Sequence, residues 1–214
     1  FRAALAMDGA HFDALHGCAI AVAQLGRTAD AIVLLERAVQ ASPQSAAARC
    51  NLGTLLNAQG RHAEALAQAE QALTLVPNLA EALNCRGGAQ MGLGQYGAAL
   101  ESFARASALM PDDFGARYNG ALALFRLARY AESLTSFDAI LARWPASAEA
   151  HNNRGLCLQA LNRHGDALAS FERTLALRPN DIDAHYNRGC ALRRLGRNGD
   201  ALAAFDRALA VAPR

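Results

Sequence analysis

Residues 148–181 read AEAHNNRGLCLQALNRHGDALASFERTLALRPND, and this pattern of residue types recurs every 34 residues along the chain. The spacing is marked by the prolines, which are all 34 residues apart: Pro43, Pro77, Pro111, Pro145, Pro179 and Pro213. A constant period of this length is typical of a solenoid built from repeated supersecondary units. The fold is therefore set by the repeat and not by a single globular core.

Counting from the third residue after each proline divides the 214-residue chain into six units, which we call repeats 1 to 6. The repeats cover residues 12–45, 46–79, 80–113, 114–147, 148–181 and 182–214, and residues 1–11 fit the end of a preceding repeat. Positions within a repeat are numbered here as columns, so that residue 148 is in column 1 and Pro179 in column 32. The sequence predicts a single solenoid domain over residues 1–214.

Each repeat is predicted to hold two helices of about 14 residues, joined by a turn at columns 14 to 16. Ala, Leu, Arg and Glu are abundant while β-branched residues are sparse, which favours an all-α protein. Column 15 is Gly in four repeats and Asn162 in repeat 5, and both residue types end helices in the left-handed conformation. N-cap side chains are predicted just before four of the first helices, at Ser45, Asp113, Ser147 and Asp181.

Small residues in columns 8 and 20 predict that the paired helices approach closely. Column 8 holds only Gly or Ala: Ala19, Gly53, Gly87, Ala121, Gly155 and Gly189. Column 20 holds only Ala or Ser: Ala31, Ala65, Ala99, Ser133, Ala167 and Ala201. Column 24 fills the space between repeats with larger residues: Leu35, Phe103, Phe137, Phe171 and Phe205. Ala69 interrupts column 24, which predicts looser packing in repeat 2.

These columns, together with the column-32 proline, resemble the tetratricopeptide repeat over essentially the whole chain. The resemblance implies an all-α, right-handed superhelical solenoid whose first helices line a concave groove. The chain departs from the family at column 4, where Trp is usual and where His151 and His185 stand in repeats 5 and 6. It departs again at column 7, where Arg86, Arg154 and Arg188 replace a usual Leu.

The composition excludes several classes of function. The net charge is only +2, which is too small for a general nucleic-acid or anionic-membrane surface. All 21 basic residues are Arg, so lysine Schiff-base chemistry and the lysine-dependent chaperone-tail clamp of some tetratricopeptide proteins are excluded. The five cysteines form no CxxC motif and are expected to be reduced and mostly buried, in a cytoplasmic protein. No cofactor and no metal site are expected.

Column 6 is rich in Asn, although Asn is a mediocre helix former. Its amides are Asn51, Asn119, Asn153 and Asn187. On a helix, columns 2, 5, 6, 9, 12 and 13 share one face, which we call the first-helix stripe, and in tetratricopeptide proteins this face lines the groove. We expect the column-6 amides to bind the backbone of an extended peptide, each with a donor and an acceptor. The alternative is that they bond neighbouring repeats or are simply solvated.

The stripe also carries aromatic and Arg side chains, which are common anchors of protein interfaces. They are Tyr118 and Tyr186 in column 5, Phe125 and Arg193 in column 12, and Arg126 and Arg194 in column 13. They predict that repeats 4 to 6 bind a protein or peptide segment that is extended and partly acidic. The alternative is a solvated charged face.

The histidines recur at the repeat spacing, so they are interpreted as parts of a tiling and not as a catalytic or metal cluster. Arg154 and Arg188 lie on the inward face of their helices. We expect them to pair with Asp166 and Asp200 of their own repeats.

Three functions remain open. The leading hypothesis is a non-catalytic protein–protein interaction scaffold. The second arises because the Asn column is similar to that of O-GlcNAc transferases and their bacterial relatives, which implies a substrate-recruiting arm of a larger enzyme. The third is a structural solenoid that self-associates end to end, since no polar capping helix follows Pro213.

Overall fold

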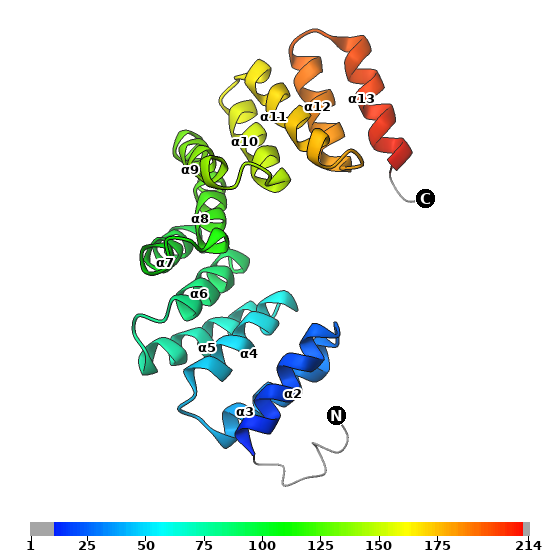
Figure 1. Cartoon of the computed structure of the whole chain (residues 1–214). Coiled ribbons are helices and arrows are strands. Elements are labelled where there is room, and N and C mark those ends of the chain that lie inside the picture. Colours follow the sequence, from blue (N-terminus) through cyan, green and yellow to red (C-terminus); the bar gives the residue numbers. More distant parts are fainter. Residues whose placement is uncertain (1–10, 212–214) are drawn as a thin grey trace. The chain divides into compact units, whose positions relative to one another are not determined.

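The computed structural model describes residues 11–211, and every element in that range is an α-helix (Figure 1). In repeats 1 to 3 the helices are α2 (Phe12–Gln24), α3 (Thr28–Ala41), α4 (Ala46–Ala58), α5 (His62–Leu75), α6 (Ala80–Gly92) and α7 (Tyr96–Leu109). In repeats 4 to 6 they are α8 (Phe114–Arg126), α9 (Tyr130–Arg143), α10 (Ala148–Ala160), α11 (His164–Leu177), α12 (Ile182–Arg194) and α13 (Asn198–Val211). The predicted all-α repeat solenoid is confirmed.

The contacts divide the chain into two compact bodies, and each is described by itself. The N-terminal body is residues 1–119 and the C-terminal body is residues 120–214. The predicted end of a preceding repeat lies outside the described residues, except for His11. Between residues 11 and 211, no helix has the length and apolar character needed to cross a bilayer.

The turn between the two helices of a repeat contains a left-handed residue in column 15, as predicted. Four of these residues are glycines with φ between 74° and 76°: Gly26, Gly60, Gly94 and Gly196. Repeat 5 uses Asn162, at φ 59°. Repeat 4 uses Ala128, at φ 58°, where the Cβ makes the left-handed conformation unfavourable.

The four predicted N-caps are all engaged. Ser45 Oγ accepts a hydrogen bond from Ala48 N, and Ser147 Oγ accepts one from Ala150 N. The carboxylates of Asp113 and Asp181 accept hydrogen bonds from backbone N–H groups, Gly115 N at 2.8 Å and Ala184 N at 2.8 Å. These contacts satisfy N–H groups that have no partner within the helix.

The column-8 glycines make room for the column-24 rings. A Cβ added to Gly87, Gly155 or Gly189 would lie 2.6, 2.4 or 2.5 Å from the Phe ring of the same repeat. Repeat 2 has Ala69 in place of that ring, and there Cys85 Sγ would lie 2.6 Å from a Cβ on Gly53. A side chain from the next repeat therefore occupies the place of the missing ring.

Column 4 departs from the family because its side chains bond the preceding proline. Arg49 and Arg117 donate from Nε to the carbonyl oxygens of Pro43 and Pro111, at 3.0 and 2.7 Å. His151 and His185 reach the carbonyl oxygens of Pro145 and Pro179 through Nε2, each at 2.9 Å. Each of these Arg and His side chains therefore links its own repeat to the preceding one through the proline carbonyl, a contact that a Trp side chain of different shape would not make in the same way.

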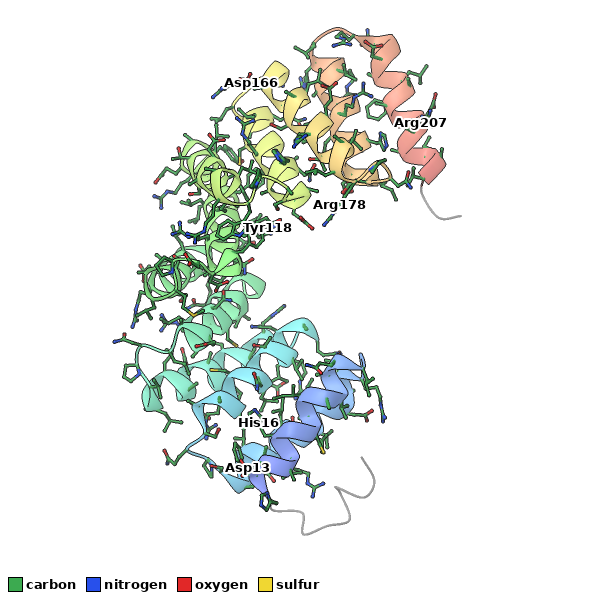
Figure 2. The ribbon with its side chains drawn as sticks, viewed as in Figure 1. Asp13, His16, Tyr118, Asp166, Arg178 and Arg207 are labelled. Atoms are coloured by element: carbon green, nitrogen blue, oxygen red, sulfur yellow. The ribbon has the colours of Figure 1, made fainter. Side chains whose placement is uncertain are left out.

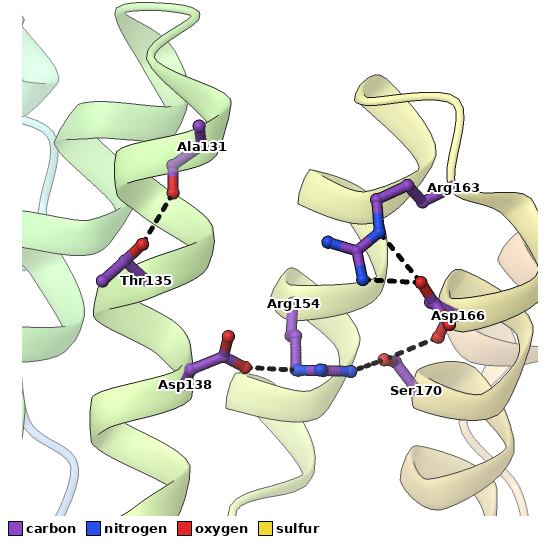
Figure 3. A network of polar contacts seen from close by, with 7 residues as sticks. All are labelled: Ala131, Thr135, Asp138, Arg154, Arg163, Asp166 and Ser170. Carbon is purple, nitrogen blue, oxygen red and sulfur yellow. Dashed lines mark hydrogen bonds and ion pairs between the residues drawn. The ribbon is translucent and has the colours of Figure 1, made fainter.

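The predicted pairs of Arg154 with Asp166 and of Arg188 with Asp200 are wrong, and Figure 3 shows the contacts that Arg154 makes instead. Arg154 Nε donates to Asp138 Oδ1 of the preceding repeat at 2.6 Å, and its Nη1 donates to Ser170 Oγ at 2.7 Å. Arg188 Nε lies 3.6 Å from Glu172 Oε1, also in the preceding repeat. Asp166 and Asp200 are instead bound by the arginines three positions before them, Arg163 and Arg197, each at 2.7 Å. An i,i+3 partner at the helix start is closer than one on the facing helix.

Candidate functional site

A pocket of about 380 Å³ opens on the first-helix stripe of the N-terminal body. Its walls come from α4 and α6, and the α7–α8 segment closes one side. From α4 the pocket takes stripe residues of columns 5, 6, 9 and 12: Cys50, Asn51, Thr54 and Asn57. From α6 it takes columns 2, 5, 6 and 9: Glu81, Asn84, Cys85 and Gly88. Met110, Asp113 and Asn119 complete it.

Small side chains leave the space for this pocket. Gly88 exposes backbone where repeats 1, 4 and 5 carry Ile or Leu, and a Cβ there would lie 3.3 Å from Asn57 Nδ2. That close approach lets Asn57 Nδ2 donate to the backbone oxygen of Cys85, at 3.0 Å. The bond joins α4 to α6 and fixes the orientation of the Asn57 amide.

The other polar groups of the pocket are also held by the protein. Asn51 Nδ2 lies 2.8 Å from Nε2 of His16, which is on the side of α2 that faces α4 (Figure 2). An amide nitrogen can only donate, so His16 Nε2 is the acceptor. Thr54 Oγ1 donates to the backbone oxygen of Cys50 at 2.9 Å. Asn84 differs, because its buried Oδ1 accepts no hydrogen bond within the described part of the chain.

The two pocket cysteines are neutral at pH 7. Burial, together with the nearby Cys85 and Glu81, raises the pKa of the Cys50 thiol to about 12. Burial likewise raises the pKa of Cys85 to about 11, although a hydrogen bond with Thr54 opposes the shift. A thiol with a raised pKa is a poor nucleophile, so these residues contribute polarisable surface and not reactivity.

The column-6 amides of the C-terminal body have partners within the protein. Asn153 Nδ2 donates to the backbone oxygen of Glu149 in its own helix at 2.9 Å. Asn187 Nδ2 donates to Asn152 Oδ1 of the preceding repeat at 3.2 Å. Of the four Asn residues in the column, the structure brings Asn51 and Asn119 together at the N-terminal pocket.

The predicted aromatic anchors each stack on a neighbour. The Tyr118 ring lies 5.4 Å from that of Phe114, and the Phe125 ring meets that of Tyr130 edge-on at 5.2 Å. Tyr186 is 57% exposed, although its ring lies 5.7 Å from that of Phe205. The predicted arginines Arg126, Arg193 and Arg194 are exposed.

Several pocket residues were not predicted: Thr54, Asn57, Glu81, Asn84 and Asp113. Four of them lie in columns 2, 5, 9 and 12 of repeats 2 and 3, and in columns 5, 9 and 12 these polar residues replace Tyr, Leu and Phe of repeat 4. Asp113 was predicted only as a helix cap, and it is both a cap and a wall of the pocket.

Several solved structures share this fold. MamA residues 41-end from Desulfovibrio magneticus RS-1 is similar at 24% identity and a TM-score of 0.72, over 78% of this chain and 94% of that chain. YrrB, described as a TPR protein with an unusual peptide-binding site, is similar at 23% identity and a TM-score of 0.67, over 84% and 92%. A tetratricopeptide repeat protein from Parabacteroides merdae ATCC 43184 reaches a TM-score of 0.78 at 21% identity, over 95% and 80%. At these identities the likeness shows the fold alone.

Comparison with curated protein sequences finds no match. The family model of the tetratricopeptide repeat matches residues 1–46, 19–80, 86–134, 118–182 and 158–214. These matches extend over nearly the entire sequence and agree with the 34-residue period of its prolines. The chain belongs to the tetratricopeptide repeat family.

Proposed function

We propose that the chain is a non-catalytic scaffold that binds an extended protein segment along the first-helix stripe. The observation that carries the proposal is the pocket between α4 and α6, which is lined largely by stripe residues and includes several amide side chains. A family fold that presents helix pairs side by side provides such a surface. The description of the similar YrrB as a protein with a peptide-binding site supports the same function.

The amides of the stripe suit a peptide backbone. Adjacent repeats stack about 10 Å apart, whereas an extended chain rises about 3.4 Å per residue. One column-6 Asn would thus meet about every third residue of a bound segment. In Asn51 and Asn187 the N–H₂ group donates to the protein, which leaves the amide oxygen to accept from a backbone N–H of the ligand.

The C-terminal body adds a preference of charge. Arg126, Arg193 and Arg194 are exposed on the stripe, and Tyr186 adds an exposed ring on α12, the helix that also carries Arg193 and Arg194. Arg binds carboxylates through several donors at once, which favours a segment with acidic residues. The free cysteines, three of them buried, are consistent with a cytoplasmic location, which is part of the proposal.

A peptide array probed with the whole chain tests the proposal. We expect hits that bind as extended segments and that lose affinity when Asn119, Asn153 and Asn187 are all replaced by Ala. Asn198→Ala, an exposed Asn at the start of α13, is the matched control and should leave binding unchanged. If the triple variant lost thermal stability and kept peptide affinity, the Asn column would be structural and the proposal would be rejected.

A second candidate is end-to-end self-association, favoured by an apolar pocket of about 510 Å³ on α12 and α13. Leu209 in this pocket is 74% exposed, whereas Leu141 and Leu175 in the same column of earlier repeats are partly buried. Light scattering against dilution measures the association. Self-association is supported if the mass of the native chain falls on dilution while Leu209→Asp has the monomer mass at every concentration. It is rejected if the native chain has the monomer mass at every concentration.

A further inference from the structure

We propose that the pocket of the N-terminal body selects a positively charged, donor-rich side chain, Arg or Lys, in the bound segment. The inference rests on the proposed function, because it assumes that an extended segment lies on the stripe. It adds the identity of the residue that enters the pocket. Three independent features of the pocket lead to it: its hydrogen-bonding state, its charge and its size.

The pocket contains several oxygen acceptors, and part of its donor capacity is used within the protein. The N–H₂ group of Asn51 is committed to His16 at 2.8 Å, and that of Asn57 is committed to the Cys85 carbonyl at 3.0 Å. The Thr54 hydroxyl hydrogen is directed at the Cys50 carbonyl at 2.9 Å. Each of these amides keeps a second N–H, and Asn57 Oδ1 already lies 3.3 Å from His62 Nδ1, but Asn51 Oδ1 and Thr54 Oγ1 keep lone pairs that a donating ligand can meet.

Asn84 contributes an acceptor that has no donor in the described part of the chain. Its Oδ1 is buried and accepts no hydrogen bond within the described residues, although the side chain lines the pocket. Buried polar groups are normally satisfied, and one without a partner in a pocket indicates a missing ligand group. A ligand with several N–H donors supplies what this acceptor lacks.

The charges of the pocket walls favour a cation. Glu81 and Asp113 are carboxylates, and no Arg is among the lining residues. The arginines closest in sequence are held elsewhere: Arg86 Nε donates to Ser102 Oγ at 2.9 Å and Arg117 Nε donates to the Pro111 carbonyl at 2.7 Å. Asp113 Oδ1 caps α8 through Gly115 N, which leaves its other oxygen for a ligand. An acidic side chain would meet like charge from Glu81 and Asp113 here.

The size and shape agree with one long side chain. A volume of about 380 Å³ is at the lower end of the range for small-molecule sites, so it accommodates a guanidinium or ammonium group with its hydration water. The Cys50 and Cys85 thiols, 5% and 6% exposed, provide an apolar, polarisable surface for the methylene stem. Arg has more donors than Lys and a planar head, so it should bind more tightly.

The test compares three peptides that differ in one side chain: acetyl-Ala-Ala-Arg-Ala-Ala-amide, and the same peptide with Lys or with the neutral isostere citrulline at the centre. Binding to the whole chain is followed by NMR titration, with the side-chain amides of Asn51, Asn84 and Asn119 as local probes. We expect the Arg peptide to bind about tenfold more tightly than the citrulline peptide, since the charge-assisted bonds are lost in citrulline. Raising the salt concentration should reduce this ratio.

Conservative variants assign the preference to the pocket. Glu81→Gln and Asp113→Asn keep the shape, and Asn still caps α8, so both variants should fold. Each should weaken the Arg peptide about threefold and leave the citrulline peptide unchanged. Glu101→Gln, an exposed Glu on α7 outside the pocket, is the matched control and should have no effect.

The outcomes separate this inference from the proposed function. Equal binding of the Arg and citrulline peptides would overturn the charge selection and leave the scaffold function standing. Arg-selective binding that shifts residues other than those of the pocket would also overturn it. If none of the three peptides binds while the array yields other ligands, the pocket does not take a basic residue. Arg-selective binding lost in both pocket variants supports the inference.

Discussion

Replacing Gly155 by Ala in α10 tests the packing that the repeat imposes on its helix pair. The added Cβ would lie 2.4 Å from Phe171 Cε1 and 2.8 Å from Cδ1 and Cζ. Carbon atoms normally approach to about 3.5–4.0 Å, so the ring or the helix must move by about 1 Å. Phe171 is fully buried, which means that its displacement disturbs the neighbouring helices as well.

The expected free-energy change is the sum of two opposing effects. Overpacking of a well-packed core costs about 1–3 kcal/mol. Ala is favoured over Gly in a helix by about 0.8–1 kcal/mol, which offsets part of that cost. Repeat 4 combines Ala121 with Phe137, so the fold can adapt to this pair, and the net loss is expected near about 1 kcal/mol.

Urea unfolding followed by circular dichroism at 222 nm, about the wavelength of the helix minimum, measures the change. Gly17→Ala is the matched control, since Gly17 is an exposed residue inside α2 with no heavy atom within 4 Å of an added Cβ. That control should be stabilised by about 0.5–1 kcal/mol through helix propensity alone. Adding Phe171→Leu to Gly155→Ala, the combination of Ala19 with Leu35 in repeat 1, should relieve the clash. Equal stabilisation by Gly155→Ala and Gly17→Ala would refute the packing argument.

Three further predictions follow from single features. Ala128→Gly should raise the stability by about 0.5–1 kcal/mol, because Gly relieves the strain at φ 58° but adds freedom to the unfolded chain; a lower urea midpoint would contradict this. A double-mutant cycle on Arg154→Ala and Asp138→Ala should give a coupling of about 0.5–1 kcal/mol, since both side chains are partly exposed, and additive effects would show that the pair is inert. The raised pKa values of Cys50 and Cys85 mean that the folded thiols stay protonated at pH values where the unfolded thiols ionise. The free energy of unfolding should therefore not depend on these thiols below about pH 9, and it should fall as the pH rises from there toward 11–12. Urea unfolding at several pH values measures this fall in the native chain and in Cys50→Ala, where it should be smaller. An equal fall in the two proteins would contradict the prediction.

The fold was readable from the sequence because its determinants are local and repeated. The 34-residue period of the prolines, the left-handed residue of column 15 and the N-caps each depend on a few neighbouring residues, and six copies reinforce one another. The small residues of columns 8 and 20 predict close packing without any knowledge of long-range contacts. Ala128 is the exception, since nothing in its residue type indicates a left-handed conformation.

The site was less predictable because hydrogen bonds depend on which atom of a neighbouring repeat is nearest. The helical periodicity of column 6 predicted that Asn51 and Asn119 lie on the stripe, but it did not predict the hydrogen bond from Asn51 to His16. The same rule did not show that Asn187 donates to Asn152 of the adjacent repeat. The expected Arg–Asp pairs were wrong because residues on the same helix turn were nearer than the ones on the facing helix.

The arginine pairs that cross repeat boundaries have a consequence for cooperativity. In the C-terminal body Arg154 binds Asp138 and Arg188 approaches Glu172, so a charged link joins repeat 4 to 5 and repeat 5 to 6. In the N-terminal body the equivalent Arg86 binds Ser102 within its own repeat, and the bonds between repeats 2 and 3 end on backbone carbonyls: Asn57 donates to that of Cys85 and Arg105 to that of Pro77. In a linear array, the free energy at each boundary decides whether neighbours melt together or one at a time. Repeats 4 to 6 should therefore exchange their amide hydrogens as one unit, while the boundary that holds the pocket opens on its own.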